Sequence, residues 1–572
     1  MIDTFALVQH PLVPTASYLL VMVSALSGAS AAYVLVVLMM HRISAYRSPL
    51  RNVPGPENAH WFKGNFVDVR EQDSTRLQEQ WVQTYGHVLK FHSALASPTL
   101  LTVDPVAVAY VLQNNDAFQK PELLRFYLSV LSDRGLAVVE GPQHKKQRKV
   151  MNPAFGPAQV RKFMSLFLEK SSELREIWGN RLSESTRKDG RLGVDALMWL
   201  NKVTLDIIGL AGFNYSFDSL NSPDEKENDI YAAIRSIITS SRDFSFVVQL
   251  FLPIFVLELL FPIFRSIPTH LSRTLDRALE EIRFVGSQLI QERKDAVLAE
   301  RTANGSGAMV KQDVRGHDLL SLLIKSNIGV EMPESMRMSD SEILSQIPTF
   351  LIAGHETTST AVAWTLLAVS CNPTIQAKLR DELRTCPTDS PTMEQLNALP
   401  YLESVVREAL RLYAPVSSID RVSMHDAEIP LQTPFVDKHG VLQSAIRVSK
   451  GDSVVIPIRL LNRSTAIWGD DANEFRPERW ENVPESVNAL PGVYAHLATF
   501  IAGARSCIGF RFSIVQIKVL LFTLVRAFEF EMALPPEDIV RSNTAIVGRP
   551  VIASNPAAGP QLPLLIRLAN LG

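Results

Sequence analysis

One segment in the second half of the chain does most to limit how the chain can fold. From Ile343 to Pro373 the sequence reads ILSQIPTFLIAGHETTSTAVAWTLLAVSCNP, which predicts a helix with apolar residues on every face. Ser339 and Glu342 have the spacing of a capping box at its start, and Asn372–Pro373 stops it. A helix that is apolar all round is surrounded by protein, so we expect a large helical domain that encloses it.

The rest of the chain fits a domain that is mainly α with a minor β part. Helical patterns predominate between about residues 155 and 412, and we find no internal repeat. Strand-like alternation is concentrated later, from Ile446 to Ile458, where Lys450–Gly451 predicts a hairpin turn. A polar stretch that contains Gly and Ser, from Glu300 to Gly316, predicts one long loop.

The charge balance argues against nucleic acid as a partner. The 572 residues include 57 basic and 59 acidic ones, a formal net charge of −2, so no overall positive field attracts phosphate backbones. The three cysteines, Cys371, Cys386 and Cys507, are odd in number and widely spaced, which fits neither a disulfide framework nor a zinc site. We therefore expect a folded part that is reduced and lies in the cytosol.

The N-terminal part of the chain predicts a membrane anchor. No charged residue occurs from Pro11 to Met40, and roughly 20 apolar residues in a helix span a bilayer. A cleaved signal peptide is the alternative, with Ala29–Ala31 as its cleavage site. It fits less well, because no positive charge precedes the apolar run and the run continues past that site. His41 and three arginines follow the run, so the positive-inside rule places the C-terminal side in the cytosol.

A second apolar segment leaves the membrane topology open. Phe244–Phe264 carries a single charge, at Glu258, but Pro253 and Pro262 would interrupt a spanning helix. These features favour short helices that are buried or dip into the membrane surface, with a second span as the alternative. The predicted parts of the chain are an anchor at 1–40 with its transmembrane helix at about 17–40, a basic, proline-rich linker at 41–56, and a folded region at 57–572.

Polar residues in the middle of the apolar helix are candidates for function. Glu356 lies there beside His355 and Thr357, and a buried charge is unfavourable unless it is paired, hydrated or used. The letters HETTS resemble half of a zinc protease motif, but position 359 is Ser, so the second histidine ligand is missing. His355 is better explained as a helix residue at the edge of the core. Gly354 has no side chain, so the helix is narrow at this point. A kink there would let water or a ligand approach the backbone.

A second group of charged residues predicts a buried network. Glu408 and Arg411 have i,i+3 spacing on one helix, which alone indicates only a weak surface pair. The turn around them is largely apolar, however, and the downstream sequence FRPERW supplies Arg479 as a third member. We expect these three residues to form a buried structural network.

The cysteine near the C-terminus identifies the family. Phe500, Gly503, Arg505, Cys507 and Gly509 fit F-x-x-G-x-R-x-C-x-G, the haem-binding signature of the cytochrome P-450 family of haem-thiolate enzymes, which this chain resembles. At average residue usage such a match arises by chance in a chain of this length about once in ten thousand. The resemblance covers nearly all of the chain after the anchor and includes the AGHETT, ExxR and PERW motifs in the family's order.

The resemblance implies a haem b cofactor with Cys507 as the axial ligand of its iron. The thiolate would donate electron density that favours O–O cleavage. Gly503 and Gly509 would let the loop pass close to the porphyrin and let backbone N–H groups point at the sulfur. Phe500 would pack by the sulfur and shield it from water.

Basic residues would hold the haem propionates, because guanidinium groups suit carboxylates. The resemblance implies Arg505 in this role, together with Arg148, Arg421 and His144. His144 stands where many members have tryptophan. Two further departures, Trp480 for a common phenylalanine and Asn462 where histidine is frequent, do not touch oxygen activation.

Two function classes follow from the resemblance. The favoured one is a membrane-anchored monooxygenase that uses O2 and electrons from NADPH through a cytochrome reductase, or through a small electron-transfer cytochrome, to oxidise an apolar substrate. The alternative is a haem-thiolate isomerase or dehydratase, or a haem-binding protein, that works without a reductase. Thr357 and Glu356 favour the first, because a hydroxyl and a carboxylate over the iron provide the proton relay that O–O cleavage requires.

Source and location are also implied only by resemblance. The phrase LDIIGLAGFNYSFDSL, from Leu205 to Leu220, resembles fungal, basidiomycete members, for which terpenoid, steroid or polycyclic aromatic substrates are expected. A microsomal member of this type would sit in the endoplasmic reticulum membrane by a single span, with its catalytic domain in the cytosol. The individual substrate is not readable from the residues.

Overall fold

The computed structural model describes most of the chain after the N-terminal apolar run. The described residues are 42–60, 63–65, 74–93, 96–185, 189–222, 270–305, 318–327, 333–542 and 546–569, with single helical positions between 28 and 40. The predicted anchor at 1–40 lies mostly outside them, and Phe244–Phe264 lies wholly outside. Both assignments stay predictions.

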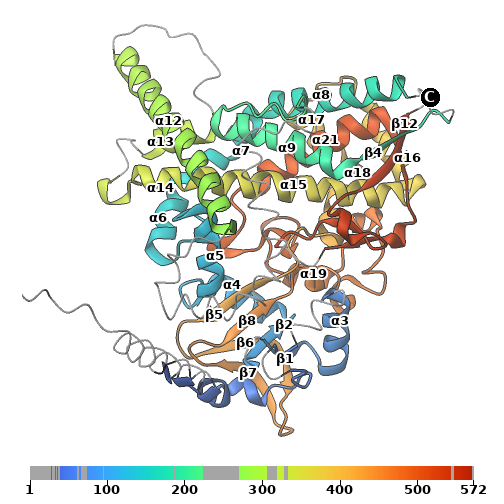
Figure 1. Cartoon of the computed structure of the whole chain (residues 1–572). Helices are drawn as coiled ribbons and strands as arrows, with labels where there is room; N and C mark the ends of the chain where they lie inside the picture. The colour runs from blue at the N-terminus through green and yellow to red at the C-terminus, as the bar shows by residue number, and fades with distance from the viewer. Residues whose placement is uncertain are drawn as a thin grey trace, which may run out of the picture.

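Helices make up most of the described structure, as expected for the region between 155 and 412 (Figure 1). They are α3 (Ser74–Tyr85), α4 (Pro105–Gln113), α5 (Glu122–Ser132), α6 (Gly141–Met151), α7 (Pro157–Lys162), α8 (Met164–Ser183), α9 (Ala196–Phe213), α12 (His270–Gly305), α13 (Leu319–Asn327), α14 (Asp340–Leu344), α15 (Gln346–Ser370), α16 (Pro373–Thr385), α17 (Met393–Asn397), α18 (Pro400–Leu412), α19 (Ile458–Leu461), α20 (Thr465–Trp468) and α21 (Phe510–Ala527).

The strands form a smaller part of the molecule, which confirms the minor β component. They are β1 (Val88–His92), β2 (Pro98–Thr102), β3 (Phe118–Gln119), β4 (Leu192–Asp195), β5 (Ile419–Ser423), β6 (Ala427–Val436), β7 (Leu442–Val448), β8 (Ser453–Ile456), β9 (Phe528–Met532), β10 (Ile539–Arg541), β11 (Pro550–Ile552) and β12 (Pro563–Leu568). In Figure 1 the sheet that contains β1, β2, β5 and β8 lies in the lower part of the view, and α8, α9, α15 and α21 lie in the upper part.

The predicted apolar helix is the buried α15. The capping box at Ser339 and Glu342 is present, but it caps the short α14, and α15 starts after Ser345. Its end is as predicted, because Pro373 occupies the first turn of α16. Helix α15 packs along α9. Gly354 permits this close approach, since a Cβ there would lie 2.8 Å from the Ile208 side chain, and the helix runs through it without interruption.

The hairpin predicted at Lys450–Gly451 is wrong. The turn exists, but β7 pairs with β6, whereas β8 pairs with β2 and β5 in another sheet. That sheet has the order β1-β2-β8-β5-β3, with β2 and β8 parallel. Turn residues specify that the chain reverses, but the strand that a segment pairs with is decided by distant residues. The predicted loop at Glu300–Gly316 is also partly wrong, because α12 continues to Gly305.

One described helix has the length and hydropathy of a membrane span. It is α9, whose apolar window is 83% buried inside the protein. Because α9 packs on α15 and belongs to the hydrophobic core, its apolar composition is explained by burial.

Candidate active site

The cysteine loop lies between two short 3-10 turns and the start of α21. The Cys507 amide donates to the Phe500 carbonyl at 2.9 Å, which closes the loop on itself. Gly503 has φ of +71°, and a Cβ there would lie 2.3 Å from the Leu112 carbonyl oxygen of α4. Only glycine fits this position. Ile501 also has a positive φ, of 60°, a strained conformation for a β-branched residue, and no sequence signal pointed to it.

The Cys507 thiol faces an internal cavity of about 230 Å³. The side chain is exposed to this space, which it helps to line. Burial raises the pKa of the Cys507 thiol, and the Gly509 backbone N–H and the positive charge of Arg148 oppose that rise. Gly509 also lines the cavity, where a Cβ would make only ordinary contact with Phe155.

The middle of α15 also lines this cavity. Ala353, Gly354, Thr357 and Thr358 line it, and the rest of the lining is mainly apolar. The Thr357 hydroxyl donates to the Ala353 carbonyl at 2.8 Å, one turn back along the helix. The predicted apolar helix and the cysteine loop are therefore the two faces of one hollow.

Glu356 turns away from this hollow and is not among the residues that line it. Its Oε1 lies 2.8 Å from Nε of Arg549, and both side chains are about nine-tenths buried. Burial raises the pKa of Glu356, and the Arg549 charge opposes the rise. The buried charge that the sequence singled out is thus paired, by a partner close to β11 that no motif indicated.

Three of the predicted propionate residues belong to a buried basic cluster beside the cysteine loop. Arg505 donates to the Val139 carbonyl at 2.7 Å and pairs with Glu140, which also lies 2.7 Å from Nζ of Lys120. Burial, together with the charges of Arg505, Arg421 and Arg125, lowers the pKa of Lys120 to about 6. Arg505 and Lys120 therefore share one carboxylate, that of Glu140. Within the described chain Arg125 Nε and His144 Nδ1 have no hydrogen-bond partner.

This cluster fits the anionic groups of a haem. A buried excess of positive charge is unfavourable unless an anion joins it, and the propionates would supply two carboxylates. Lys120, Arg125 and Glu140 were missed by the sequence reasoning, because they come from segments without a motif. His144 is buried, and its pKa falls to about 4 because of burial and the neighbouring charges of Lys120 and Arg148.

Arg148, the fourth predicted propionate residue, is held at the cysteine loop instead. Its guanidinium donates to the Ser506 carbonyl at 2.6 Å and to Asn152 Oδ1 at 2.9 Å. Helix α6 is thereby fixed against the residue that precedes Cys507. Phe500, also in the loop, packs edge-on against Tyr494 and at a tilt against Phe510 at the start of α21.

The structure brings Glu408, Arg411 and Arg479 together. The two guanidiniums lie within 2.8 and 3.3 Å of Glu408, and the carboxylate of Glu408 and the guanidinium of Arg411 are fully buried. Trp480 donates to the same carboxylate at 3.1 Å. Removing one partner from such a buried pair costs about 3–5 kcal/mol, because the other charge is left without compensation.

Asn462 joins this network to the cysteine loop. Its carbonyl accepts from Arg411 at 2.9 Å, while its side-chain oxygen accepts from the Ala498 amide at 3.0 Å. Its side-chain nitrogen donates to Thr499 at 2.8 Å. The residue that the sequence marked as a departure is thus a direct link between the charge network and the loop.

The zinc alternative has no support in the structure. His355 is buried, and its Nδ1 lies 2.7 Å from the Leu351 carbonyl, as expected for a helix residue at the core. No group of three or more His, Cys, Asp or Glu residues in the described ranges could hold a metal ion.

Comparison with known proteins gives one family over nearly the whole chain. The family described as Cytochrome P450 matches residues 54–551. Cytochrome P450 monooxygenase 205 of Postia placenta is 48% identical over 520 residues, which cover 91% of this chain and 93% of that protein. Cytochrome P450 monooxygenase 128 of the same fungus is 45% identical over 524 residues, with coverage of 91% and 93%. Cytochrome P450 monooxygenase claW of Ampulloclitocybe clavipes is 32% identical over 539 residues, with coverage of 93% and 95%.

The family match agrees with the shared position of the two motifs, the cysteine loop and the polar turn of the apolar helix, which the sequence alone did not relate in space. The cysteine loop and the polar turn of the apolar helix line one apolar cavity, and relatives that match over this whole region are named as monooxygenases. The chain belongs to the cytochrome P450 family and is an oxidoreductase of its monooxygenase class.

Proposed function

We propose that this chain oxidises an apolar substrate with O2 and with electrons that an NADPH-dependent cytochrome reductase delivers. The observation that carries the proposal is the cavity that lies between Cys507 and Thr357. Its walls combine one cysteine, three threonines and one serine with side chains that are otherwise mainly apolar. Such a space holds an apolar molecule and excludes bulk water.

The residues present fit a haem in this cavity. Cys507 would ligate the iron, and Arg505, Arg421 and His144, with Lys120 and Arg125, would surround the propionates. When bound, haem supplies the redox chemistry that activates O2, tuned by the thiolate of the cysteine. Arg148 and the Gly509 N–H lower the pKa of the Cys507 thiol against the effect of burial, and so favour the thiolate form that a ligand requires.

Thr357 and Glu356 would supply protons in different ways. Thr357 is at the cavity wall, and its hydroxyl proton points to the Ala353 carbonyl. To donate into the cavity, that hydroxyl must rotate and accept a proton in exchange. Glu356 is the neighbouring acid, but its pairing with Arg549 must loosen before it can pass a proton toward Thr357.

The apolar lining supports a hydrophobic substrate of terpenoid, steroid or polycyclic aromatic type. Phe155, Phe350, Ile208 and Ile458 contribute rings and branched side chains to the cavity, and charged side chains are absent from its described lining. The proposal includes attachment to the endoplasmic reticulum membrane through residues 1–40, which would place the cavity close to dissolved apolar compounds.

The test is turnover by the full-length, haem-loaded protein in membranes. We expect product from a panel of apolar compounds when NADPH, a cytochrome reductase and O2 are all present, and none when the reductase is omitted. Turnover of hydroperoxides alone would instead support a haem-thiolate isomerase or dehydratase. The reaction is also run under ¹⁸O2, and mass spectrometry of the product checks whether one of its oxygen atoms comes from O2.

A substitution at the sulfur tests the assignment of the iron ligand. Cys507→Ala should remove the thiolate-type carbon-monoxide difference band of the reduced protein and all monooxygenase activity, because no other side chain of the loop can donate a thiolate. Cys371→Ala, which removes a cysteine elsewhere in the chain, is the matched control and should leave both unchanged. A thiolate-type band that survives in Cys507→Ala would refute the assignment.

A further inference from the structure

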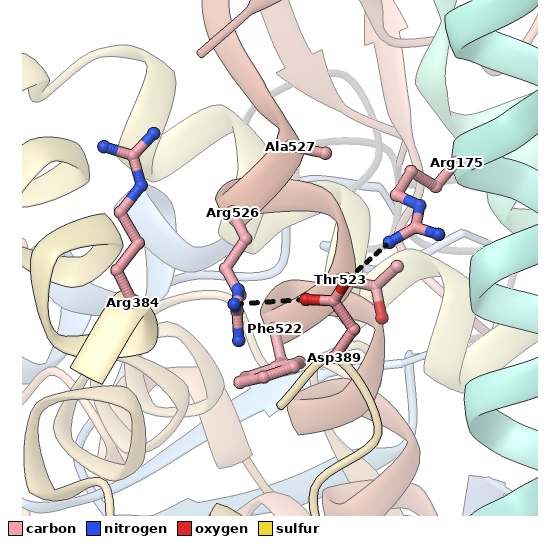
Figure 2. A pocket seen from close by; sticks show the side chains of 7 residues that line it. All are labelled: Arg175, Arg384, Asp389, Phe522, Thr523, Arg526 and Ala527. Atoms are coloured by element: carbon pink, nitrogen blue, oxygen red, sulfur yellow. Dashed lines mark ion pairs between the residues drawn. The ribbon is translucent and has the colours of Figure 1, made fainter. Parts of the chain in front are cut away.

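The ion pairs of this protein differ in how far they are shielded from water. In the hollow at the C-terminal end of α21, Arg526 and Arg175 lie 3.1 and 3.7 Å from the carboxylate of Asp389, on the loop after α16 (Figure 2). The Asp389 side chain is 69% exposed, so water competes for both contacts and they add little stability. The pair of Glu356 and Arg549 is different, because both of its side chains are about nine-tenths buried.

Arg549 belongs to a hairpin that is clamped between two other elements. It immediately precedes β11, which pairs with β10. The Gly548 amide donates to the Pro415 carbonyl at 2.9 Å, and the Gly548 carbonyl accepts from Trp364 Nε1 at 2.9 Å. Trp364 lies two turns beyond Glu356 on α15. The residue before Arg549 is therefore fixed to α15 on one side and to the segment of Pro415 on the other.

The segment of Pro415 forms part of the cavity wall. Pro415 and Val416 both line the cavity. Val416 pairs with Val547 in an antiparallel bridge, and Arg541 of β10 donates to the Pro415 carbonyl. A molecule that presses on this wall acts on the hairpin through direct backbone contacts. Three successive residues, 547–549, thus connect the cavity wall with the buried ion pair.

Arg549 controls the charge of Glu356. Burial raises the pKa of the Glu356 carboxyl, and the effects that oppose this rise both come from Arg549. His355, the neighbouring titratable residue, is buried and its pKa falls to about 4, so it adds no charge near neutral pH. A Glu356 carboxyl that loses its arginine therefore favours the protonated form, in which it can donate a proton.

We propose that Arg549 is a positioning residue that holds Glu356 in reserve, and that a substrate which fills the cavity releases it through the clamped hairpin. Proton supply to Thr357 then depends on an occupied cavity. This inference deepens the proposed function and rests on it. The released guanidinium has a short route to water, because Ile546, three residues before it, is 50% exposed.

The proposal has a thermodynamic consequence that a purely structural ion pair lacks. If filling the cavity weakens the pair, the pair must weaken filling of the cavity by the same factor. Removing the arginine should therefore tighten the binding of a molecule that fills the cavity. A pair that only holds the hairpin predicts the reverse, because its loss loosens a wall of the binding site.

The experiment compares two probes on the full-length, haem-loaded protein by the change that each causes in the haem spectrum. Imidazole and 4-phenylimidazole both bind iron through a ring nitrogen, and only the second adds a ring that fills the cavity. We expect Arg549→Gln to raise the affinity for 4-phenylimidazole relative to imidazole about tenfold. Arg549→Lys keeps the charge and should leave this ratio near that of the wild-type protein.

Infrared difference spectra give a second readout. In the wild-type protein 4-phenylimidazole should raise the C=O stretch of a protonated carboxyl group, and imidazole should not. The band should be absent in Glu356→Gln, and in Arg549→Gln it should be present without any ligand. Both measurements need haem but neither O2 nor a reductase. They can therefore fail while the monooxygenase assay succeeds, and the reverse.

Arg293→Gln is the matched control. Arg293 lies 3.5 Å from the buried carboxylate of Asp318, so this change removes a similarly buried cation from an acid next to α13. It should leave the ratio of the two affinities unchanged, because neither residue lines the cavity. An unchanged or lower ratio in Arg549→Gln that retains its haem spectrum would overturn the proposal. So would a wild-type carboxyl band that does not respond to 4-phenylimidazole.

Discussion

At the scale of single residues, a substitution at Thr357 tests whether its hydroxyl has a catalytic role or only a structural one. Its hydroxyl bonds back to the Ala353 carbonyl, which is the geometry of an ordinary helix threonine, yet it also lines the cavity opposite Cys507. Thr357→Ala should leave the haem spectrum and substrate binding nearly intact. Product formed per NADPH should fall about tenfold or more, with peroxide or water in place of product, because positioned proton transfer contributes at least that much.

Thr358 offers a matched control for this measurement. Its hydroxyl also borders the cavity but pairs with Ser513 at 2.8 Å, so Thr358→Ala removes a neighbouring hydroxyl without touching the proposed relay. If Thr357 serves only the helix, its alanine variant keeps the coupling of the wild-type enzyme and loses about 1 kcal/mol of stability.

His355 makes stability depend on pH. Its pKa falls to about 4, mainly because burial disfavours the charged ring, although the Leu351 carbonyl opposes this. Below pH 6.5 this residue is protonated in the unfolded chain, whereas in the folded protein it becomes protonated only near pH 4. The free energy of unfolding therefore decreases as pH falls through this window, by about 3 kcal/mol at most.

His355→Gln should remove this contribution. We expect a smaller drop in the thermal midpoint between pH 7 and pH 5 than in the wild-type protein, measured at constant ionic strength. His425→Gln, at an exposed position on the surface, is the control and should keep the wild-type slope. An identical slope in His355→Gln would show that this imidazole does not govern the acid sensitivity.

At the scale of elements, α6 is the helix that we expect to meet the reductase. Arg148 fixes α6 to the carbonyl before Cys507, while Lys145 and Lys149 are exposed. Lys145 forms an exposed ion pair with Asp116 at 2.7 Å. Lys146 differs, since its ammonium lies 3.1 Å from Glu342 of the capping box and supports α14. Lys145→Glu with Lys149→Glu should slow reduction by an acidic reductase at low salt. The effect should fade as salt rises, because exposed charges are screened over about 10 Å at 0.1 M.

The reduction rate is measured by stopped flow on haem-loaded protein. Arg447→Glu with Lys450→Glu makes the same change of charge at β7 and its turn, and should leave the rate unchanged. An unaltered rate at low salt in the α6 variant would contradict docking at this helix.

Elements with strong local signals could be predicted, and their partners could not. The apolar faces specify α15 within the segment itself, so this helix was found from the sequence, although the capping box that was assigned to its start caps the separate α14. Lys450–Gly451 marks a real turn, but nothing local says that β8 joins β2. The same limit applies to the site, where Cys507 stood in a motif while Lys120 and Arg549 arrive from distant segments.

At the scale of the whole molecule, we predict that the N-terminal anchor and the catalytic region are separable parts. The family match begins at residue 54, after the predicted anchor and most of the linker. Deleting residues 2–40 should move most of the protein into the soluble fraction and preserve haem incorporation, because the described core does not draw on those residues. Fractionation after carbonate extraction measures this. A variant that stays fully inserted would show that Phe244–Phe264 spans the membrane.

The five-stranded sheet has a consequence for how the protein is made. Strand β2 is fully buried and pairs in parallel with β8, which follows it by about 350 residues. A ribosome that adds about 5–20 residues per second needs roughly 20 to 70 s to cover that distance. For that interval the nascent chain carries a complete apolar strand with one open edge, the kind of surface on which neighbouring nascent chains associate. The speed of translation between these two strands is therefore a variable in the yield of folded enzyme.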